Sequence, residues 1–409
     1  MPRWLIPLII LLIVIVVLEI YTFQAFKTIS NSKFVRFLFL TTSVGVYVYF
    51  FLTFLMYDRG NGQTPQFQMA MGLLLTVTIP KLVIILMLFG EDIYRWVLKA
   101  ISAILPGETK PLAGRRKFIS QIALGIAAIP FASFIYGIIQ GKYNYKVLKY
   151  SLTFKDLPEA FDGFTITQIS DIHSGSFTNK EKIKYGVDLI NEQKSDIMLF
   201  TGDIVNNKAD EMEDWMDVFD KLEAKEGKFS ILGNHDYGDY MDWENPQDKI
   251  DNFQQIKDIH KKIGFDLLLN ENRYLEKDGQ KIALLGVENW GKGRFMKKGD
   301  LQQASANVRK EDFKILMTHD PSHWEYKVKK DDFNYHLTLS GHTHGLQMGI
   351  EIPGWLKWSP SKYVYKQWAG LYEEAGRYIN VNRGFGYHAF PGRVGIWPEI
   401  TVIELKKGV

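Results

Sequence analysis

Four long apolar runs in the first third of the chain constrain its fold more than any other feature. They cover residues 4–23, 34–56, 67–90 and 118–141. Each is close to the ~20 residues that a helix needs to cross a bilayer. The alternative is a buried helical bundle, but soluble cores rarely supply four such runs in series. We therefore expect four transmembrane helices in a membrane domain over residues 1–141, followed by a second domain over residues 142–409.

The basic residues of the short loops predict how these helices are oriented. Lys27 and Lys33 lie between the first two runs, with Arg36 at the edge of the second, and the segment between the last two runs contains Arg95, Lys99, Lys110, Arg115, Arg116 and Lys117. Lys and Arg accumulate on the cytoplasmic side of cell membranes, so we expect both loops inside and the second domain in the periplasm or exterior. Arg115-Arg116 before an apolar run also resembles a twin-arginine export signal. A basic stop at a helix end explains the same residues equally well.

Other charged and amphipathic residues of the first domain predict two local features. Apolar residues recur at helical spacing over 93–104, which suits a helix lying at the inner interface. Glu19 lies inside the first run and Lys81 inside the third. Because an isolated charge is costly in lipid, we expect these two residues to pair.

Composition excludes several classes of function. The chain has no cysteine, which rules out thiolate zinc sites, disulfides and a cysteine nucleophile. Its net charge is only +3 and no long basic block accompanies it, so we do not expect nucleic acid as a partner.

From residue 143 onward, apolar strands alternate with amphipathic helices, a pattern typical of an α/β domain. We expect strands at 164–169, 197–200, 229–232, 281–287, 313–317 and 337–339. A capping box of Thr178 and Glu181 predicts one helix start, and a second helix is expected at 211–224. Polar motifs follow the strands, at the sheet edge where functional sites collect.

These motifs contain the ligand types of a dinuclear metal site. In chain order they are Asp171-Ile172-His173, Gly202-Asp203, Gly233-Asn234-His235-Asp236, His319 and Gly341-His342-Thr343-His344. One histidine after a strand is usually a packing residue, but five of the nine histidines fall here. Imidazole, carboxylate and amide ligands without sulfur favour Mn, Fe or Zn. Two such ions ~3.5–4 Å apart need an anionic bridge, which Asp203 can supply.

The ordered motifs resemble the calcineurin-like metallophosphoesterase superfamily over roughly residues 150–409. Within it, the branch of membrane-associated or exported bacterial phosphodiesterases is most similar, also in the tail Asn382-Arg383-Gly384-Phe385-Gly386, Pro391 with Arg393, and Pro398-Glu399-Ile400. The resemblance implies a four-layer α/β fold, with two mixed sheets packed face to face and flanked by helices.

The resemblance also implies a division of the ligands between two metals. Asp171, His173, Asp203 and His344 would hold one ion, and Asp203, Asn234, His319 and His342 the other. His235 would lie near the substrate phosphate and protonate the leaving oxygen, or stabilise the transition state, while a hydroxide on the metals attacks phosphorus. Asp236 would orient His235 or cap a turn.

The substrate contacts are less sharply defined by the sequence. Arg393 can clamp a phosphate or head group, and a structural ion pair fits it equally well. Six aromatic residues, with three lysines among them, gather over 355–372. They fit either a bilayer interface or the cover of a sheet edge. We expect Trp355 and Trp358 to contact a lipid substrate.

These observations lead to one principal function and two alternatives. The principal one is a membrane-anchored phosphoesterase with two divalent metals, acting on envelope or lipid-linked phosphoesters. A cytoplasm-facing pyrophosphatase of a nucleotide-linked lipid precursor, of the UDP-diacylglucosamine type, keeps the chemistry and reverses the topology. The second alternative is a sensor or transporter, which binds phosphorylated ligands without hydrolysing them.

Overall fold

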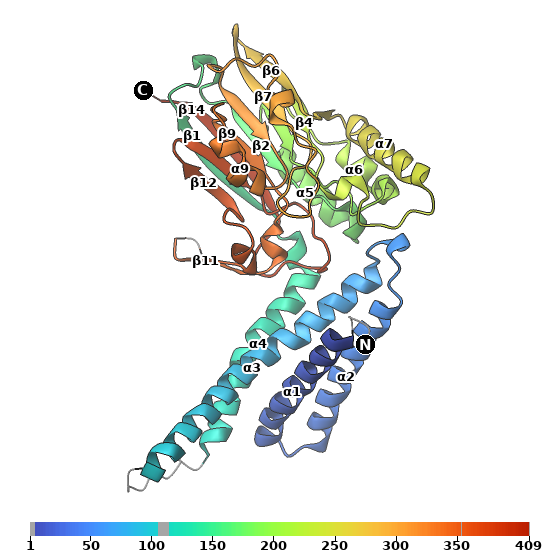
Figure 1. Ribbon diagram of the computed structural model, residues 1–409, viewed down its shortest axis with the longest axis vertical. Helices are drawn as coiled ribbons and strands as arrows, with labels where there is room; N and C mark the ends of the chain where they lie inside the picture. The colour runs from blue at the N-terminus through green and yellow to red at the C-terminus, as the bar shows by residue number, and fades with distance from the viewer. Residues whose placement is uncertain (1–4, 105–113, 353, 409) are drawn as a thin grey trace. The chain divides into compact units, whose positions relative to one another are not determined.

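The computed structural model describes residues 5–104, 114–352 and 354–408 (Figure 1). They form two compact units. The first contains residues 1–57 and 66–136, and the second contains residues 58–65 and 137–409. The expected domain boundary between residues 141 and 142 stays a prediction.

The first unit is helical. Its helices are α1 (Leu5–Ile29), α2 (Lys33–Leu55), α3 (Pro65–Ile104) and α4 (Arg115–Ile139). Each is long and apolar enough to cross a membrane, as the four apolar runs predict. The separate interfacial helix expected at 93–104 is wrong, because these residues continue α3, which is 40 residues long.

The expected charge pair inside the first unit is confirmed. The Lys81 ammonium contacts the Glu19 carboxylate and donates a hydrogen bond to Ser43 Oγ at 2.8 Å. Lys81 also borders a cavity of about 360 Å³ whose other lining residues are mainly apolar. Both charges of the pair are thus compensated within a segment that would otherwise be too polar for lipid.

Two six-stranded mixed sheets form the centre of the second unit. In spatial order, the first sheet contains β1 (Lys146–Phe154), β14 (Glu399–Lys407), β2 (Thr165–Ile169), β3 (Ile197–Phe200), β4 (Gly227–Ser230) and β5 (Asp266–Leu267). The second contains β12 (Gly370–Glu374), β13 (Arg377–Val381), β9 (Leu337–Ser340), β8 (Lys314–Met317), β7 (Gln280–Gly286) and β6 (Glu271–Lys277). A small hairpin joins β10 (Ile350–Ile352) to β11 (Leu356–Trp358).

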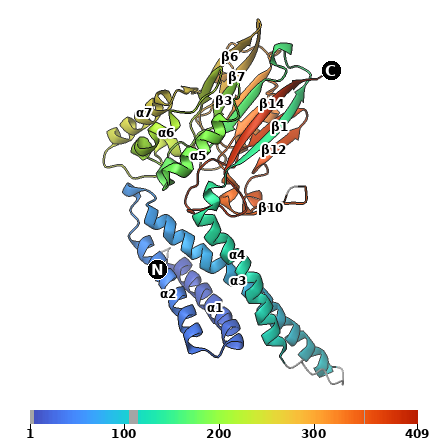
Figure 2. The same ribbon diagram turned by 180° about the vertical axis from the view of Figure 1, so that it is seen from behind.

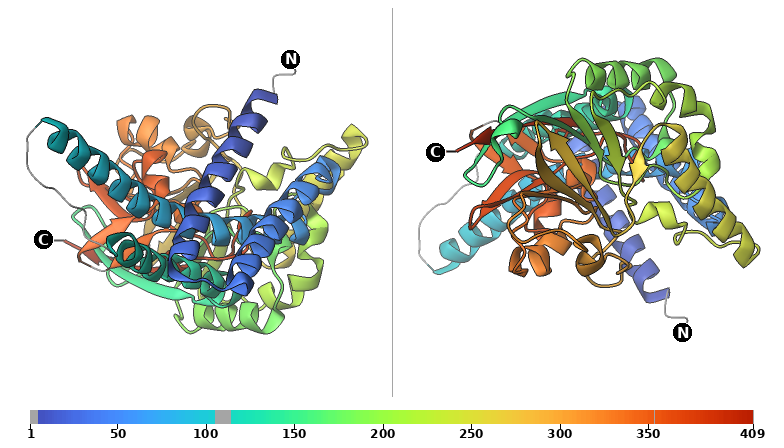
Figure 3. Two further views of the ribbon diagram at one scale, coloured as in Figure 1. Left: turned by 90° about the horizontal axis from the view of Figure 1, so that it is seen from below. Right: turned by 90° about the horizontal axis from the view of Figure 1, so that it is seen from above.

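The helices of this unit lie on the outer faces of the sheets. They are α5 (Lys180–Asn191), α6 (Met216–Phe219), α7 (Pro246–Lys262), α8 (Leu301–Ala304) and α9 (Ser322–Tyr326). Figures 1 and 2 show α5, α6 and α7 together on one side of the strands, and the right-hand view of Figure 3 again shows the green to yellow helices beside the strands.

Alternating side chains of the strands build the layers. In β3, Met198 and Phe200 join the core beneath α5 and α7, whereas Ile197 and Leu199 join the core between the sheets. In β7, the alternate residues Ala283 and Leu285 pack with Trp324 of α9. Because successive strand residues face opposite sides, both faces of each sheet are covered. The four-layer fold expected from the resemblance is confirmed.

The parallel strands position the site. In the first sheet β2, β3 and β4 are parallel, and in the second β7, β8 and β9 are parallel. Their carboxyl ends therefore meet along one edge of each sheet, where the polar motifs follow.

Candidate metal centre

Each expected metal ligand follows the end of a strand within a few residues. Asp171 and His173 follow β2, Asp203 follows β3, and Asn234 follows β4. In the second sheet His319 follows β8, and His342 and His344 follow β9. The structure brings these seven residues into two adjoining clusters across the two sheets.

The backbone at these positions is strained. Asp171, His173, Asp203, His342 and His344 have positive φ angles between 48° and 71°, in the left-handed region that residues with a Cβ seldom adopt. Glycines give the room for it, since a Cβ at Gly233 would overlap the Asp203 carboxylate and one at Gly341 would overlap the Asp171 carboxylate. Strain of this kind concentrates at functional sites.

The first cluster contains Asp171, His173 and His344. His344 Nε2 lies 3.1 Å from Asp171 Oδ1 and 3.0 Å from His173 Nε2. Burial lowers the pKa of both histidines, so their rings are neutral and can present lone pairs. Two neutral imidazoles and a carboxylate converging on one point are a suitable ligand set for a divalent metal.

The second cluster contains Asp203, His319 and His342, with the Asn234 amide beside them. Asp203 Oδ2 lies 3.0 Å from His319 Nε2. His342 Nδ1 lies 2.7 Å from Asn234 Oδ1 and 3.3 Å from His319 Nε2. One carboxylate oxygen, one amide oxygen and two imidazole nitrogens therefore face a common space.

Asp203, of the second cluster, also lies next to the first cluster. The oxygen that faces His319, Oδ2, also lies 3.6 Å from His173 Nε2 in the first cluster. Burial alone would raise the pKa of Asp203, but the His319 and His235 rings hold it far below its usual range. Burial also disfavours the charged form of His319, which by itself would lower its pKa. The Asp203 carboxylate beside it outweighs burial and raises the pKa of His319 to about 10. The carboxylates thus favour positive charge in this space, which a divalent ion would supply in place of a proton.

Groups outside the clusters orient three of the ligands. The His319 Nδ1–H donates to the Thr201 carbonyl oxygen at 2.7 Å, which leaves the Nε2 lone pair for a metal. Asn234 Nδ2 donates to the Tyr240 hydroxyl at 2.9 Å, which turns Oδ1 toward His342. His342 Nε2 lies 2.8 Å from the Tyr365 hydroxyl, so the Nδ1 lone pair faces the cluster. These orientations fit bound metal ions.

His235 lies beside the first cluster and has separate anchors. Its backbone N–H donates to Asp203 Oδ1 at 2.8 Å, and its Nδ1 lies 2.7 Å from the Asn206 carbonyl oxygen. The Asp236 carboxylate accepts hydrogen bonds from the backbone N–H groups of Gly233, Asp203 and Ile204 at 2.8–2.9 Å. Asp236 therefore fills the expected turn-capping role and joins the loops after β3 and β4.

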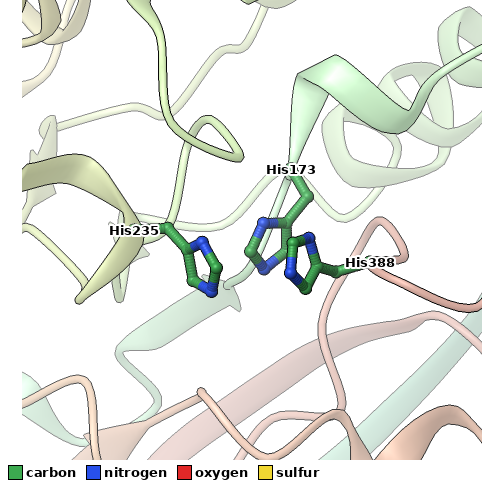
Figure 4. A group of neighbouring side chains, drawn as sticks. All are labelled: His173, His235 and His388. Atoms are coloured by element: carbon green, nitrogen blue, oxygen red, sulfur yellow. The ribbon is translucent and has the colours of Figure 1, made fainter. Parts of the chain in front are cut away.

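His388 is a site residue that the sequence reasoning missed. Its ring is stacked on His173 at 4.7 Å and lies 4.4 Å from the His235 ring, and the three side chains converge (Figure 4). Its Nδ1 lies 3.1 Å from Asn206 Oδ1. His388 follows β13, which is parallel to β9. The rule that polar residues after parallel strands build the site would have found it, had β13 been predicted.

Arg393 lies against the first cluster, in a fully buried position. Its guanidinium donates to the backbone carbonyls of Arg383 and Gly386, and Nη2 lies 3.1 Å from His344 Nδ1. These contacts favour a structural role, although the partners are carbonyls rather than the ion pair considered from sequence. Contact of Arg393 with a phosphate stays a prediction.

The aromatic stretch divides between three environments. Tyr365 contacts His342, and Trp368 is buried. Trp355 is 79% exposed in the β10–β11 hairpin, and Trp358 of β11 is half-buried. The buried part of the stretch is consistent with the cover of a sheet edge, and the bilayer-interface alternative stays a prediction for the exposed part. Contact of Trp355 and Trp358 with a lipid substrate stays a prediction.

Comparisons with known proteins agree with this geometry. Residues 164–346 match the calcineurin-like phosphoesterase family. An uncharacterized metallophosphoesterase of Bacillus subtilis, YkuE, is 34% identical over 253 residues, which cover 61% of this chain and 82% of the relative. The chain belongs to the calcineurin-like metallophosphoesterases. It is therefore a metal-dependent hydrolase of phosphoesters, and divalent metal ions are its cofactors.

The first domain of this metallophosphoesterase has relatives too. Residues 2–142 match a family described as the probable transmembrane domain of calcineurin-like phosphoesterases. A transmembrane protein with metallophosphoesterase domain from Danio rerio is 25% identical, covering 67% of this chain and 60% of the relative. Among solved structures, the phosphopantetheinyl hydrolase PptH of Mycobacterium tuberculosis aligns with a TM-score of 0.33 at 12% identity, covering 54% of this chain and 89% of that one. Because residues 2–142 match the transmembrane family and residues 164–346 the phosphoesterase family, the protein is a membrane-associated metallophosphoesterase.

Proposed function

We propose that this protein is a two-metal phosphodiesterase or phosphohydrolase of the cell (inner) membrane, acting on envelope or lipid-linked phosphoesters at the outer side. The position of Asp203 carries the two-metal part of the proposal. One oxygen of its carboxylate lies 3.0 Å from a histidine of one cluster and 3.6 Å from a histidine of the other. A single ion would not require a carboxylate shared between two separate histidine pairs.

The ligand sets follow from the two clusters. Asp171, His173, Asp203 and His344 would hold one ion, and Asp203, Asn234, His319 and His342 the other. These nitrogen and oxygen donors suit Mn, Fe or Zn. Such ions, when bound, would supply Lewis-acid chemistry, which polarises phosphoryl oxygens and makes water easier to deprotonate.

His235 is the residue we assign to proton transfer. The Asn206 carbonyl accepts from its Nδ1–H, so Nε2 is the atom free to hold a proton for the leaving oxygen. The Asp203 carboxylate fixes the backbone at this residue. His235 would thus act on the substrate from a position fixed by Asp203, which would hold the metals.

His388 is assigned a supporting position on the substrate side. Its ring lies against both His173 and His235 and reaches the site from the segment after β13, a strand that no expected metal ligand follows. We expect it to contact a non-bridging oxygen of the phosphoryl group, because an imidazole N–H is a suitable donor for that oxygen.

A cavity beside Asn234 offers room for the rest of the substrate. Its volume is about 270 Å³, and Tyr240, Arg294 and Phe295 are among its lining residues. Arg294 can bind a second anionic group, and the two aromatic rings can contact a sugar or glycerol unit. This composition suits a phosphodiester with a polar alcohol better than a free phosphate.

Hydrolysis assays on the full chain in lipid nanodiscs test the proposal. The protein is stripped of metal with a chelator, and Mn²⁺ is then added with a chromogenic phosphodiester. We expect no turnover before Mn²⁺ and turnover after it, both for the wild type and for Asp278→Asn, a change in the exposed β6–β7 turn. Metal-dependent binding of the phosphodiester without hydrolysis would instead favour the sensor or transporter alternative.

A further inference from the structure

The β10–β11 hairpin presents an apolar face to the outside. Its strands pair Ile350 with Trp358 and Ile352 with Leu356, so these four side chains share one face. Ile350, Ile352 and Leu356 are 49%, 43% and 38% exposed. A two-stranded hairpin of a water-soluble surface would normally place such residues inward.

The opposite face of the hairpin contains its charged residues. Glu351 pairs with Lys357 across the strands, and it also forms an ion pair with Arg383 at 2.6 Å. The Lys357 ammonium donates to the Ala369 carbonyl oxygen. The hairpin is therefore fixed on the catalytic unit through its polar face. This arrangement holds the apolar face outward rather than leaving it free to fold back.

Neighbouring residues extend the apolar face and give it an interfacial composition. Trp355 at the hairpin turn and Tyr363 are 79% and 74% exposed, and Val364 is exposed too. Trp358 Nε1 lies 3.5 Å from the Tyr363 hydroxyl, which places Tyr363 beside the hairpin. Lys362 lies over the Tyr363 ring. Tryptophan, tyrosine and lysine around aliphatic residues are typical of a bilayer interface.

Hydrogen bonds also connect the hairpin to the last turn of α4. Residues 137–139 of this helix belong to the second unit, so these contacts lie within that unit. Gly349 N–H, next to β10, donates to the Val394 carbonyl oxygen at 2.9 Å. The adjacent Arg393 N–H donates to the carbonyl oxygen of Gly137, in the last turn of α4, at 3.1 Å. The end of a transmembrane helix lies at the bilayer surface, so the hairpin begins two hydrogen bonds away from that surface.

We propose that the apolar face of the β10–β11 hairpin, with Trp355 and Tyr363, inserts into the lipid surface beside the end of α4. The ligand of this surface is the head-group and upper acyl region of the bilayer, in which interfacial segments bury their apolar face by ~5–10 Å. The metal ligands His342 and His344 lie just before β10 in the chain. The insertion would hold the metal centre at a fixed height above the lipid. The proposal does not depend on the substrate proposed above.

Single cysteines provide a test, because the chain has none of its own. Leu356→Cys and Ile352→Cys place a fluorescent label on the apolar face, and Lys357→Cys places it on the polar face of the same strand. Asp278→Cys is the matched distant control. Asp278 lies in the exposed turn between β6 and β7. This turn is at the amino end of β7, whereas the metal centre lies beyond the carboxyl ends of the parallel strands, so the control is at the opposite end of the sheet.

Each labelled full-length variant is placed in nanodiscs of phosphatidylcholine and phosphatidylglycerol, with and without lipids that carry a nitroxide quencher near the head group. Variants are compared only after their metal content matches that of the wild type. We expect strong quenching of the labels at positions 352 and 356, weaker quenching at 357 and none at 278. Equal quenching at 356 and 278 would overturn the proposal. A blue-shifted label at 356 without lipid quenching would overturn it as well, because it would mean that a protein covers the face.

Discussion

His235 is held by two hydrogen bonds, from its backbone N–H to Asp203 and between its ring and Asn206. Neither bond uses Nε2. In the proposed mechanism, replacing His235 with Ala removes the proton donor and leaves all seven expected ligands in place. We expect the variant to bind the same amount of metal as the wild type and to lose about 10²–10⁴-fold in turnover.

Turnover and metal content must be measured on the same His235→Ala sample. If the metal content falls with the activity, His235 is a ligand and the proposed role in proton transfer is wrong. A chromogenic substrate with a better leaving group gives a second readout. We expect it to be less affected by the substitution, because its leaving oxygen needs no proton.

Tyr365 has a narrower role, which is to orient His342. Its hydroxyl lies 2.8 Å from His342 Nε2, on the side of the ring opposite to the Nδ1 that faces Asn234. In Tyr365→Phe this contact is lost while the ring is retained. We expect the affinity for metal to fall by about 10–100-fold, as for other partners of ligating histidines. Titration of the stripped protein with Mn²⁺ measures it, and Tyr363→Phe, which changes an exposed tyrosine, is the control. An unchanged affinity would show that Tyr365 does not orient His342.

At the level of single residues, the sequence was informative where side-chain type and spacing decide the role. The seven expected ligands come together in two clusters because each follows a strand whose apolar run is visible in the sequence. His388 and Tyr365 were not assigned to the site, since β13 was not predicted and Tyr365 was seen as one of six aromatic residues. The carbonyl partners of Arg393 belong to Arg383 and Gly386, in the preceding segment without strands or helices. No local sequence pattern encodes the path of that segment.

At the level of elements, local signals gave approximate boundaries. The strand at 197–200 was predicted with the bounds that β3 has, but the strand expected at 229–232 lies at Gly227–Ser230. α5 starts with Asn179 as its N-cap rather than Thr178, because the Asn179 side chain accepts from the Lys182 N–H at 3.0 Å. The helix expected at 211–224 is a 3₁₀ helix, Ala209–Trp215, followed by the short α6.

Long-range pairing explains what the sequence could not provide. β14 lies between β1 and β2, parallel to the first and antiparallel to the second, although more than 200 residues separate it from them in the chain. A local hydrophobic pattern predicts a strand but not its neighbours. The length of α3 could not be predicted from a local pattern either. Residues 93–104 are amphipathic, and this pattern fits a separate surface helix and a continuation of α3 equally well.

The Glu19–Lys81 pair provides an element-scale prediction. Its residues connect α1 to α3, and Ser43 of α2 accepts a hydrogen bond from the same ammonium. We expect Glu19→Gln and Lys81→Met each to destabilise the membrane unit, and the double variant to be more stable than the sum of the two losses by about 0.5–3 kcal/mol.

Thermal unfolding in detergent measures this coupling. Glu19→Gln combined with Lys99→Met is the matched control. Lys99 lies in α3, as Lys81 does, but its side chain is exposed. Additive losses for Glu19 and Lys81, equal to those of the control, would show that the contact contributes no coupling energy.

At the level of the whole molecule, the orientation in the membrane follows from the basic loops. In the structure, Arg115 contacts Glu91 at 2.9 Å and Arg116 contacts Asp92 at 3.0 Å. These ion pairs give the arginine pair a structural role within the first unit. They do not alter the orientation argument, because acidic residues contribute little to the positive-inside rule.

We therefore expect the C-terminus to lie outside the cytoplasm. A C-terminal alkaline phosphatase fusion should be active, since that enzyme matures outside, and a green fluorescent protein fusion should be dark if it is exported unfolded. A fluorescent fusion together with an inactive phosphatase fusion would place the metal centre in the cytoplasm. The substrate would then be sought among nucleotide-linked lipid precursors.

The central claim is that one carboxylate, Asp203, joins two metal sites, and the metal content of purified protein tests it most directly. Elemental analysis of the full chain, loaded with Mn²⁺ and freed of excess ion, should give about two ions per chain. Asp203→Asn should lose metal from both sites, whereas His319→Ala should weaken mainly the second site. Two ions per chain in Asp203→Asn, or one ion per chain in the wild type under saturating Mn²⁺, would contradict the account.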